Sequence, residues 1–460
     1  MRMKHVGIIG GGPGGLMTAY LLEKMADTPV SITLFEASHR LGGKVLTPRF
    51  HHVPVRYEAG AAEFYDYAHF DEDPLKDLIA ELGLSIGRMG GSAVIMRDQI
   101  ISNLEDIREH LGPHAQRELT AFDQLAKDRI NPAEFFHSDH PDGAPHPPDD
   151  RRFDTLLAGI AEPATRQFVE HLIHSDLATE PHRTSITYGL QNYLMNDPAY
   201  MQLYSIVGGN EQLPRELAAR IHATTLLEHR VERVDKQGNK LRVTSHCRGV
   251  SRTDEFDYVV VALPHNSVPN VTFAGEHLSA AVREHQSHYD HPAHYLRVTI
   301  LFDRPFWRSR LSDSFWMLDS FGGCCLYDES SREPGHSHGI LGWLLGGEIV
   351  REMSSWDDDR LIAAALDSLP EFLQSGREHF LEGRVHRWVG AVNAMPGGDV
   401  YHNLDQRHRP EPRQHAELLF VGDYLFDSTL NGVLDSAEYV ASCIAGELAE
   451  RSTVQTTPLY

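Results

Sequence analysis

Cysteine is scarce in this chain. Four of its 460 residues are cysteines, and no two of them stand at the spacing of a metal site: Cys247, Cys324, Cys325 and Cys443. The adjacent pair Cys324 and Cys325 is interpreted as packing within a strand, not as a redox centre. Because the chain has so few thiols, we expect by default that the protein is located in the cytoplasm, where thiols stay reduced.

Long apolar runs and positive charge are also lacking. No run of 18 apolar residues exists, so no integral membrane segment is expected, and the strand-like start predicts no secretion leader. The net charge of −23 argues against nucleic acid and anionic membranes as partners, and it is compatible with a cationic substrate. The 29 histidines form no HExxH or HxxxH pair on a convincing helix, so no metal is assigned.

What the chain does have is a glycine-rich start, VGIIGGGPGGL over residues 6–16. Its glycines fit G-x-G-x-x-G after an apolar run, and a helical pattern, a second strand (residues 31–35) and an acid follow. This order is the dinucleotide fingerprint in its required context, with the phosphates at the helix N-terminus and the acid on a ribose. The residues expected to hold the dinucleotide are Gly10, Gly12, Pro13, Gly14, Gly15 and Glu36.

The next segment, ASHRLGGKV over residues 37–45, carries a resemblance. Its Arg40-x-Gly42-Gly43-Lys44 resembles the Arg-x-Gly-Gly-Arg signature of the flavin-containing amine oxidase superfamily. That superfamily includes monoamine, polyamine and L-amino-acid oxidases, protoporphyrinogen oxidase and phytoene-type desaturases. The resemblance implies FAD as cofactor, with this turn as a second clamp on its pyrophosphate. Lys44 departs from the signature, because lysine supplies charge but no bidentate fork.

Further segments match the family in the same order. Residues 57–64 resemble the segment beside the flavin ring, and residues 204–214 resemble the turn that begins the next helix of the FAD domain. Residues 259–264 resemble the strand and Pro turn at the boundary between the domains. Residues 418–437 resemble a segment of the family in which a Gly-Asp or Gly-Glu holds the ribityl or phosphate arm of FAD. In the family, a helix follows whose N-terminus points at the flavin. The FAD-binding residues that the resemblance implies are Ala37, Arg40, Gly42, Gly43, Lys44, Gly60, Ala61, Val231, Gly422, Asp423, Gly432 and Val433.

The expected fold class is α/β: a Rossmann-type FAD-binding domain interleaved with a mixed α+β substrate-binding domain. The FAD domain is expected at 1–75, 205–268 and 385–460, and the substrate domain at 76–204 and 269–384. Helical patterns lie at 74–83, 117–126, 155–173 and 360–373, and strand-like runs at 295–302, 314–318 and 339–345. A Pro-rich loop is expected at 137–148.

Two residues are expected on the substrate side. Many amine oxidases place a lysine near flavin N5, and Arg297 stands at that position when counted back from Trp307. Arginine cannot act as a neutral base, so Arg297 is expected to hold reduced-flavin charge or a substrate carboxylate, or to form a structural ion pair. Glu63 stands where L-amino-acid oxidases carry a carboxylate-binding arginine, which favours a cationic group instead.

The favoured function is oxidation of an amine C–N bond to an imine by hydride transfer to flavin N5, with O2 as acceptor. The substrate is expected to be a small amine or amino-acid derivative. One alternative is a C–C dehydrogenase of the phytoene desaturase or protoporphyrinogen oxidase type, favoured by the absent lysine and by Val433 in place of an aromatic ring. Another is a non-catalytic protein like the Rab GDP dissociation inhibitors. The oligomeric state stays open, a homodimer being one alternative.

Overall fold

The computed structural model describes residues 3–67, 73–91, 93–136, 151–332, 335–398 and 402–456, so the Pro-rich loop expected at 137–148 lies outside the described residues. The chain forms two compact units, each built from separate segments. Unit 1 comprises Met1–Val45, Glu211–Asp290 and Pro396–Tyr460, and unit 2 comprises Leu46–Asn210 and His291–Met395. The α/β fold class is confirmed, whereas the exact domain limits expected from the sequence stay a prediction.

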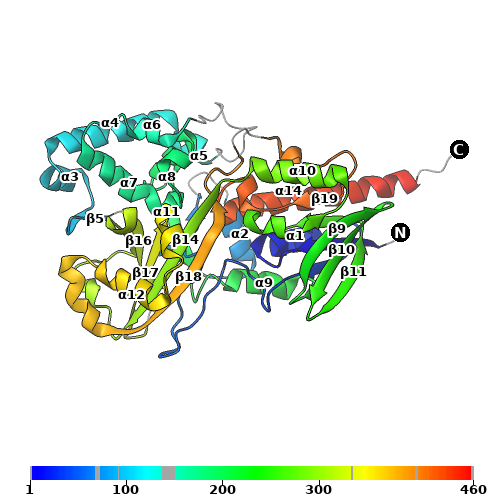
Figure 1. Cartoon of the computed structure of the whole chain (residues 1–460), viewed down its shortest axis with the longest axis horizontal. Coiled ribbons are helices and arrows are strands. Elements are labelled where there is room, and N and C mark those ends of the chain that lie inside the picture. The colour runs from blue at the N-terminus through cyan, green and yellow to red at the C-terminus, as the bar shows by residue number, and fades with distance from the viewer. Residues whose placement is uncertain are drawn as a thin grey trace. The chain divides into compact units, whose positions relative to one another are not determined.

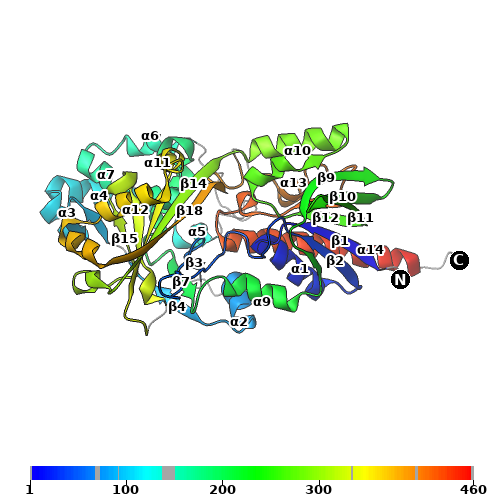
Figure 2. The ribbon, with the colours of Figure 1, turned by 60° about the horizontal axis from the view of Figure 1, so that its bottom comes forward.

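Unit 1 is centred on a five-stranded parallel sheet of order β19-β12-β1-β2-β8 (Figures 1 and 2). The strands are β1 (Lys4–Ile9), β2 (Val30–Phe35), β8 (Thr224–Leu226), β12 (Tyr258–Val261) and β19 (Leu418–Phe420). Most residues of β1, β12 and β19 are buried, as expected for parallel strands covered on both faces. Helices α1 (Pro13–Met25) and α14 (Leu430–Thr456) pack against each other.

A second sheet in unit 1 has the order β11-β10-β9-β13. Its strands are β9 (Arg230–Gln237), β10 (Lys240–Cys247), β11 (Val250–Phe256) and β13 (Thr272–Phe273), and the remaining α-helices are α9 (Gln212–Arg220), α10 (Glu276–His288) and α13 (Leu404–His408). Side chains from both sheets, including Phe35, Val231 and Phe420, share one apolar cluster. The two sheets of unit 1 therefore share a core.

Unit 2 contains a seven-stranded sheet of order β18-β14-β17-β16-β15-β5-β6 and a three-stranded sheet of order β3-β7-β4 (Figure 2). The strands of the first are β5 (Val94–Met96), β6 (Gln99–Ile101), β14 (Pro292–Phe302), β15 (Phe315–Leu318), β16 (Cys324–Asp328), β17 (Gly339–Gly346) and β18 (Phe380–Asn393). Those of the second are β3 (Phe64–Asp66), β4 (Ile86–Met89) and β7 (Gln202–Ile206). The strand-like runs expected at 295–302, 314–318 and 339–345 are thus confirmed as β14, β15 and β17.

The α-helices of unit 2 are α2 (Pro74–Glu81), α3 (Leu104–His110), α4 (Pro113–Arg129), α5 (Pro132–Phe136), α6 (Phe153–Leu157), α7 (Pro163–Leu177), α8 (Ile186–Leu194), α11 (Glu348–Met353) and α12 (Asp358–Asp367). The helices expected at 74–83 and 117–126 are confirmed as α2 and α4. Asp73 caps α2 by accepting a hydrogen bond from Lys76 N at 3.1 Å.

Two helix predictions were wrong in extent. The single helix expected at 155–173 is two helices, α6 and α7, because Pro163 cannot continue a helix from the preceding turn and instead begins α7. The helix expected at 360–373 ends with α12 at Asp367, and Pro370 separates it from a 3₁₀ segment, Glu371–His379.

The prediction that the adjacent cysteines pack within a strand is confirmed. Cys324 and Cys325 lie at the start of β16, are buried, and are free thiols. Among the residues that the structure describes, no helix is long and apolar enough to cross a membrane.

Candidate active site

The glycine turn of unit 1 lies between β1 and the start of α1. Gly10 has φ +114°, and a Cβ there would stand 2.3 Å from Ala262 O, so only glycine allows this bend. A Cβ at Gly15 would stand 2.0 Å from Gly10 O, which explains why α1 needs glycine to approach the turn. A Cβ at Gly12 would meet only Gly43 Cα, at 3.8 Å, among the described residues. Open space is therefore left at Gly12, at the N-terminus of α1.

That helix terminus suits an anion. The N-cap of α1 is Gly12, no side chain from the described residues caps it, and Pro13 occupies the first helical position. The first backbone N–H groups of a helix need partners, and the dipole there favours negative charge. A Cβ at Gly14 would stand 3.1 Å from the Val421 side chain, so Gly14 lets α1 lie close to the end of β19. The turn thus fits a pyrophosphate.

Glu36 closes the same turn from the end of β2. Its Oε2 accepts a hydrogen bond from Gly11 N at 2.9 Å, and its Oε1 accepts one from Ser38 N at 2.7 Å. The carboxylate is therefore held beside the glycines, and Ala37 is the next residue along the chain. This placement is the one a ribose-binding acid requires.

The second glycine turn lies against the first. Gly42 N donates to Gly11 O at 2.8 Å, and both Gly42 and Gly43 have positive φ, +104° and +54°. Arg40 donates from Nη1 to Leu41 O at 3.1 Å and from Nη2 to Gly43 O at 2.7 Å, so its guanidinium braces this turn. The two signatures read from the sequence are thus brought into direct contact.

Lys44 and Asp423 meet although 379 positions separate them. Lys44 Nζ lies 3.1 Å from Asp423 Oδ2, in a partly buried ion pair. Gly422 N donates to Ser436 Oγ of α14 at 3.1 Å, which ties this acid's segment to the last helix. The N-terminal and C-terminal FAD-binding segments expected from the sequence are therefore joined within unit 1.

The start of α14 is tightly turned. A Cβ at Gly432 would stand 2.4 Å from Asp427 O, and Gly432 N donates to Thr429 Oγ1 at 3.2 Å. A Cβ at Gly14 would stand 3.5 Å from the Val433 side chain, so Val433 lies next to Gly14. Val231, on β9, is instead buried in the apolar core of unit 1. Gly432 and Val433 thus belong to the neighbourhood of the glycine turn.

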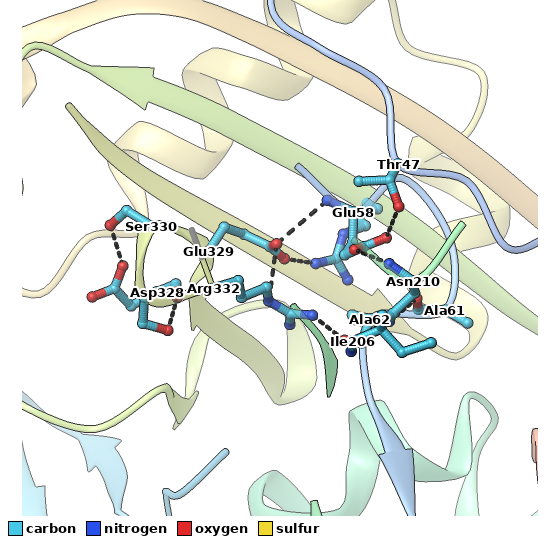
Figure 3. Close-up of polar contacts among 12 residues, drawn as sticks. Thr47, Glu58, Ala61, Ala62, Ile206, Asn210, Asp328, Glu329, Ser330 and Arg332 are labelled. Carbon is cyan, nitrogen blue, oxygen red and sulfur yellow. Dashed lines mark hydrogen bonds and ion pairs between the residues drawn. The ribbon is translucent and has the colours of Figure 1, made fainter. Parts of the chain in front are cut away.

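Gly60 and Ala61 belong to unit 2, in a segment held by a buried polar network (Figure 3). Glu58 accepts hydrogen bonds from Asn210 N and Thr47 Oγ1, each at 2.9 Å, and Asn210 Nδ2 donates to Ala61 O at 2.9 Å. Burial raises the pKa of Glu58 to about 7, with Arg332 opposing that rise and Glu329 adding to it. The backbone of residues 58–62 is therefore held by side chains on both sides.

Arg297 lies in the middle of β14, fully buried, and forms an ion pair with the equally buried Glu329. Its guanidinium carbon lies 4.9 Å from the centre of the Tyr327 ring. A Cβ at Gly342 would stand 3.2 Å from Glu329 Oε1, so glycine on the neighbouring strand leaves room for the pair. Within the part of the chain that the structure describes, Arg297 Nε and Nη1 have no hydrogen-bond partner.

Glu329 and Arg332 extend this pair toward the Glu58 segment (Figure 3). Glu329 Oε2 accepts from Glu58 N at 3.3 Å and lies 3.2 Å from Arg332 Nε, while Arg332 Nη1 donates to Ala62 O. One carboxylate thus contacts two guanidinium groups and one backbone amide. Arg297 is coupled through Glu329 to the segment that precedes Glu63.

Glu63 lines a cavity of about 370 Å³ that lies wholly within unit 2. Burial raises the pKa of Glu63 and outweighs Arg332, Arg297 and the Tyr327 hydroxyl, which all act to lower it. Its Oε2 is buried without a hydrogen-bond partner among the described residues. Asp176 of α7 lines the same cavity, and burial together with the Glu63 charge raises the pKa of Asp176 to about 8.

The sequence pointed to Glu63 and Arg297 but missed their surroundings. Glu329, Arg332 and Asp176 are charged residues outside every motif, and in a sequence such residues look like solvated side chains. Asp176 follows the expected helix of 155–173 and has no local signal. Strand pairing and the packing of α7 against β15, β16 and β17 within unit 2 bring these residues together.

These features define a class: a dinucleotide-binding α/β protein with a separate, acid-lined ligand cavity. The profile of the flavin-containing amine oxidoreductase family matches residues 13–445, so the chain belongs to that family. Its members are FAD-dependent oxidoreductases, so the enzyme class and the FAD cofactor expected from the sequence are confirmed.

Individual relatives are distant. The flavin-dependent L-tryptophan oxidase of Lentzea aerocolonigenes is 24% identical, over 94% of this chain and 96% of its own length. Aplysianin-A of Aplysia kurodai is 22% identical over 58% of this chain, and the match spans 49% of that relative. Among solved structures, putrescine oxidase bound to putrescine superposes with a TM-score of 0.74 at 18% identity, covering 97% of this chain and 99% of that one. This last likeness shows the fold.

Proposed function

We propose that this protein oxidises a small amine to an imine, which water then hydrolyses, and that O2 is the electron acceptor and is reduced to hydrogen peroxide. FAD, when bound, supplies an acceptor for the hydride that leaves the carbon next to nitrogen. Enzymes of this family act on several substrates, so family membership alone does not identify the substrate. We assign substrate selection to the residues that line the cavity of unit 2.

The observation that carries the choice is the carboxyl group of Glu63, a residue that lines the cavity and whose Oε2 has no hydrogen-bond partner among the described residues. A buried acceptor without a donor costs about 1–3 kcal/mol, and an amine substrate supplies N–H donors. An apolar C–C substrate supplies none and would leave this carboxylate unpaired. The polar group therefore favours amine oxidation over dehydrogenation of a hydrocarbon chain.

Arg297 is the residue of this chain that we assign to positioning. Its guanidinium forms an ion pair with Glu329, and Glu329 accepts a hydrogen bond from Glu58 N in the segment before Glu63. Arg297 therefore helps to fix that segment. Because arginine keeps its proton, it acts by charge and hydrogen bonding and not as a base.

The apolar part of the cavity wall does not decide between amine oxidation and C–C dehydrogenation. Much of the cavity wall is apolar, with Met195, Met201, Phe315 and Met317 among the lining residues. Such a wall suits the carbon skeleton of either substrate class, so it does not distinguish them.

An anaerobic titration tests the proposal. Purified protein with bound FAD is mixed with primary amines, diamines and amino acids, and the flavin absorbance near ~450 nm is followed. Loss of this absorbance with an amine, and peroxide formation when O2 is admitted, are the expected results. A flavin that no amine bleaches would refute amine oxidation and leave C–C dehydrogenation. A flavin that is bleached but reacts only with artificial acceptors would refute the O2 assignment alone.

A further inference from the structure

Sulfur is concentrated at the cavity of unit 2. Four of the 11 methionines of the chain are among the described residues that line it, and one cysteine joins them. These five residues are Met89, Met195, Met201, Met317 and Cys325. They come from separate helices, strands and loops, so the fold and not any one motif gathers them. Methionine adapts to irregular apolar walls, but its thioether is also a target of oxidants.

The proposed function supplies an oxidant at this place. In it, O2 is reduced to hydrogen peroxide while the cavity holds the amine or its imine product. The peroxide therefore forms beside the residues that line the cavity and meets them before it reaches bulk solution.

Cys325 is not the sulfur that should react. Peroxide attacks a thiolate, and burial together with the nearby Glu63 charge raises the pKa of the Cys325 thiol well above its ordinary value. A thioether has no proton to lose, so its reaction with peroxide does not depend on ionisation. The reactive sulfur of the cavity is therefore that of its methionines.

Exposure ranks these four methionines. Met195 is half-buried, whereas Met89 is 9% exposed, Met317 4% and Met201 3%. Met317 Sδ also accepts a hydrogen bond from Ser175 Oγ at 3.5 Å, which engages a sulfur lone pair. Because oxidation follows exposure of the sulfur, Met195 is the first of the four to react.

We propose that Met195 is a modification site, at which hydrogen peroxide made by the enzyme oxidises the thioether to the sulfoxide. A sulfur lone pair forms the new S–O bond, the O–O bond of the peroxide breaks, and the second oxygen leaves as water with both hydrogens. Sulfur loses two electrons and the peroxide gains them. This inference rests on the proposed function, because that reaction is the source of the peroxide.

Oxidation of Met195 alters the cavity wall itself. Met195 N donates to Gln191 O at 2.9 Å at the end of α8, so the backbone holds the side chain in place. That side chain packs against the apolar cluster to which α7 and α8 contribute. A sulfoxide oxygen there is a polar acceptor against apolar carbon, which is unfavourable unless a donor reaches it. We therefore expect KM for the amine to rise as turnover proceeds.

Turnover in the presence of catalase tests the proposal. Catalase destroys peroxide in bulk solution but is far too large to enter a cavity of about 370 Å³. Met3, which is 52% exposed, and the half-buried Met25 of α1 report oxidation from the bulk. After turnover of the holoenzyme on an amine that bleaches its flavin, peptide mass spectrometry should find about tenfold more sulfoxide at Met195 than at either reference.

Peroxide added to resting holoenzyme, without amine and without catalase, is the comparison. It reaches every methionine from bulk solution, so the more exposed Met3 should be oxidised at least as fast as Met195. The preference for Met195 should therefore appear only when the enzyme makes the peroxide.

A second readout follows activity during turnover. Met195→Leu keeps an apolar side chain but removes the sulfur, so the variant should lose its own initial rate more slowly than the wild type loses its own. Methionine sulfoxide reductases should restore the wild-type rate. Met96→Leu at the end of β5 is the matched control, because this buried methionine is not among the residues that line the cavity. Its decline should equal that of the wild type.

Two results would overturn the inference while amine oxidation and peroxide formation stood. One is turnover with catalase that leaves Met195 no more oxidised than Met3 and Met25. The other is a decline in activity that Met195→Leu does not slow. Amine oxidation without peroxide, measured in parallel with catalase omitted, would instead refute the O2 assignment and this inference with it.

Discussion

The buried ion pair of Arg297 and Glu329 shows what a single residue does in this protein. Both side chains are fully buried, and Gly342 on the adjacent strand makes room for them. Bringing two charges out of water costs several kcal/mol, and only close pairing and further hydrogen bonds offset that cost. Glu329 obtains them from Arg332 and from Glu58 N.

Arg297→Met should therefore destabilise the protein by about 3–5 kcal/mol, because Glu329 keeps a charge that loses a close partner. Glu329→Gln removes the charge and retains an oxygen for Glu58 N. The double variant should be more stable than Arg297→Met alone. Urea unfolding of the wild type, both single variants and the double variant measures the coupling. Additive effects of the two substitutions would contradict the pairing.

Glu58 makes stability depend on pH at the same scale. Its pKa is about 7 in the folded protein and near 4.5 when unperturbed. Between these values the folded chain holds a proton that the unfolded chain has released. The contribution of Glu58 to stability is therefore fully present below about pH 4.5 and is lost as the pH rises to about 7.

Glu58→Gln should abolish this part of the pH dependence. Glutamine keeps the contacts to Asn210 N and Thr47 but does not titrate. The difference in unfolding free energy, variant minus wild type, should rise between pH 4.5 and 7 by at most about 1.4 kcal/mol per pH unit. Denaturant unfolding at several pH values measures it, with Asp128→Asn, which changes an exposed carboxylate on α4, as the control. A difference that does not vary with pH would mean that Glu58 is ionised throughout.

At the scale of elements, sequence patterns predicted what is local. The glycine turn, β1, α1 and Glu36 follow one another directly along the chain, and α2 is set by its own cap, so both were predictable. The errors arose where proline overrides an amphipathic pattern, at Pro163 and Pro370. The partners of Arg297 and Glu63 were not predictable, because sheet pairing and packing bring them together from distant segments.

Two glycines of the same turn should respond differently to alanine. Gly12 has φ −77°, and a Cβ there finds open space, so Gly12→Ala should leave the stability of the FAD-free protein unchanged. The added methyl would occupy the space expected for the pyrophosphate and lower FAD affinity at least ~10-fold. Gly15→Ala places Cβ 2.0 Å from Gly10 O and should destabilise the FAD-free protein by at least about 2 kcal/mol.

Fluorescence titration with FAD and urea unfolding without FAD separate these two effects. If Gly12→Ala binds FAD as tightly as the wild type, the pyrophosphate does not lie at this turn. If Gly15→Ala is as stable as the wild type, the close approach of α1 to the turn is not a constraint.

At the scale of the whole molecule, the chain alternates between two units. Unit 1 takes three separate segments and unit 2 takes the two between them. The sequence predicted this interleaving through the order of the family's motifs along the chain. The sequence could not predict at which residues each compact unit begins and ends, because those limits depend on contacts between distant segments.

The parallel sheet of unit 1 has a consequence for the synthesis of the protein. In its strand order β19-β12-β1-β2-β8, β1 pairs with β12 (Tyr258–Val261), and β12 pairs with β19 (Leu418–Phe420). Both partners lie far along the chain from β1. A ribosome making the chain releases β1, α1 and β2 long before β12, β19 and α14, the helix that packs on α1, have been synthesised. Two strand edges of the nascent FAD unit therefore stay unpaired until β12 and β19 have been synthesised. Truncation between β12 and α14 would leave its sheet edge or its helix layer unfinished.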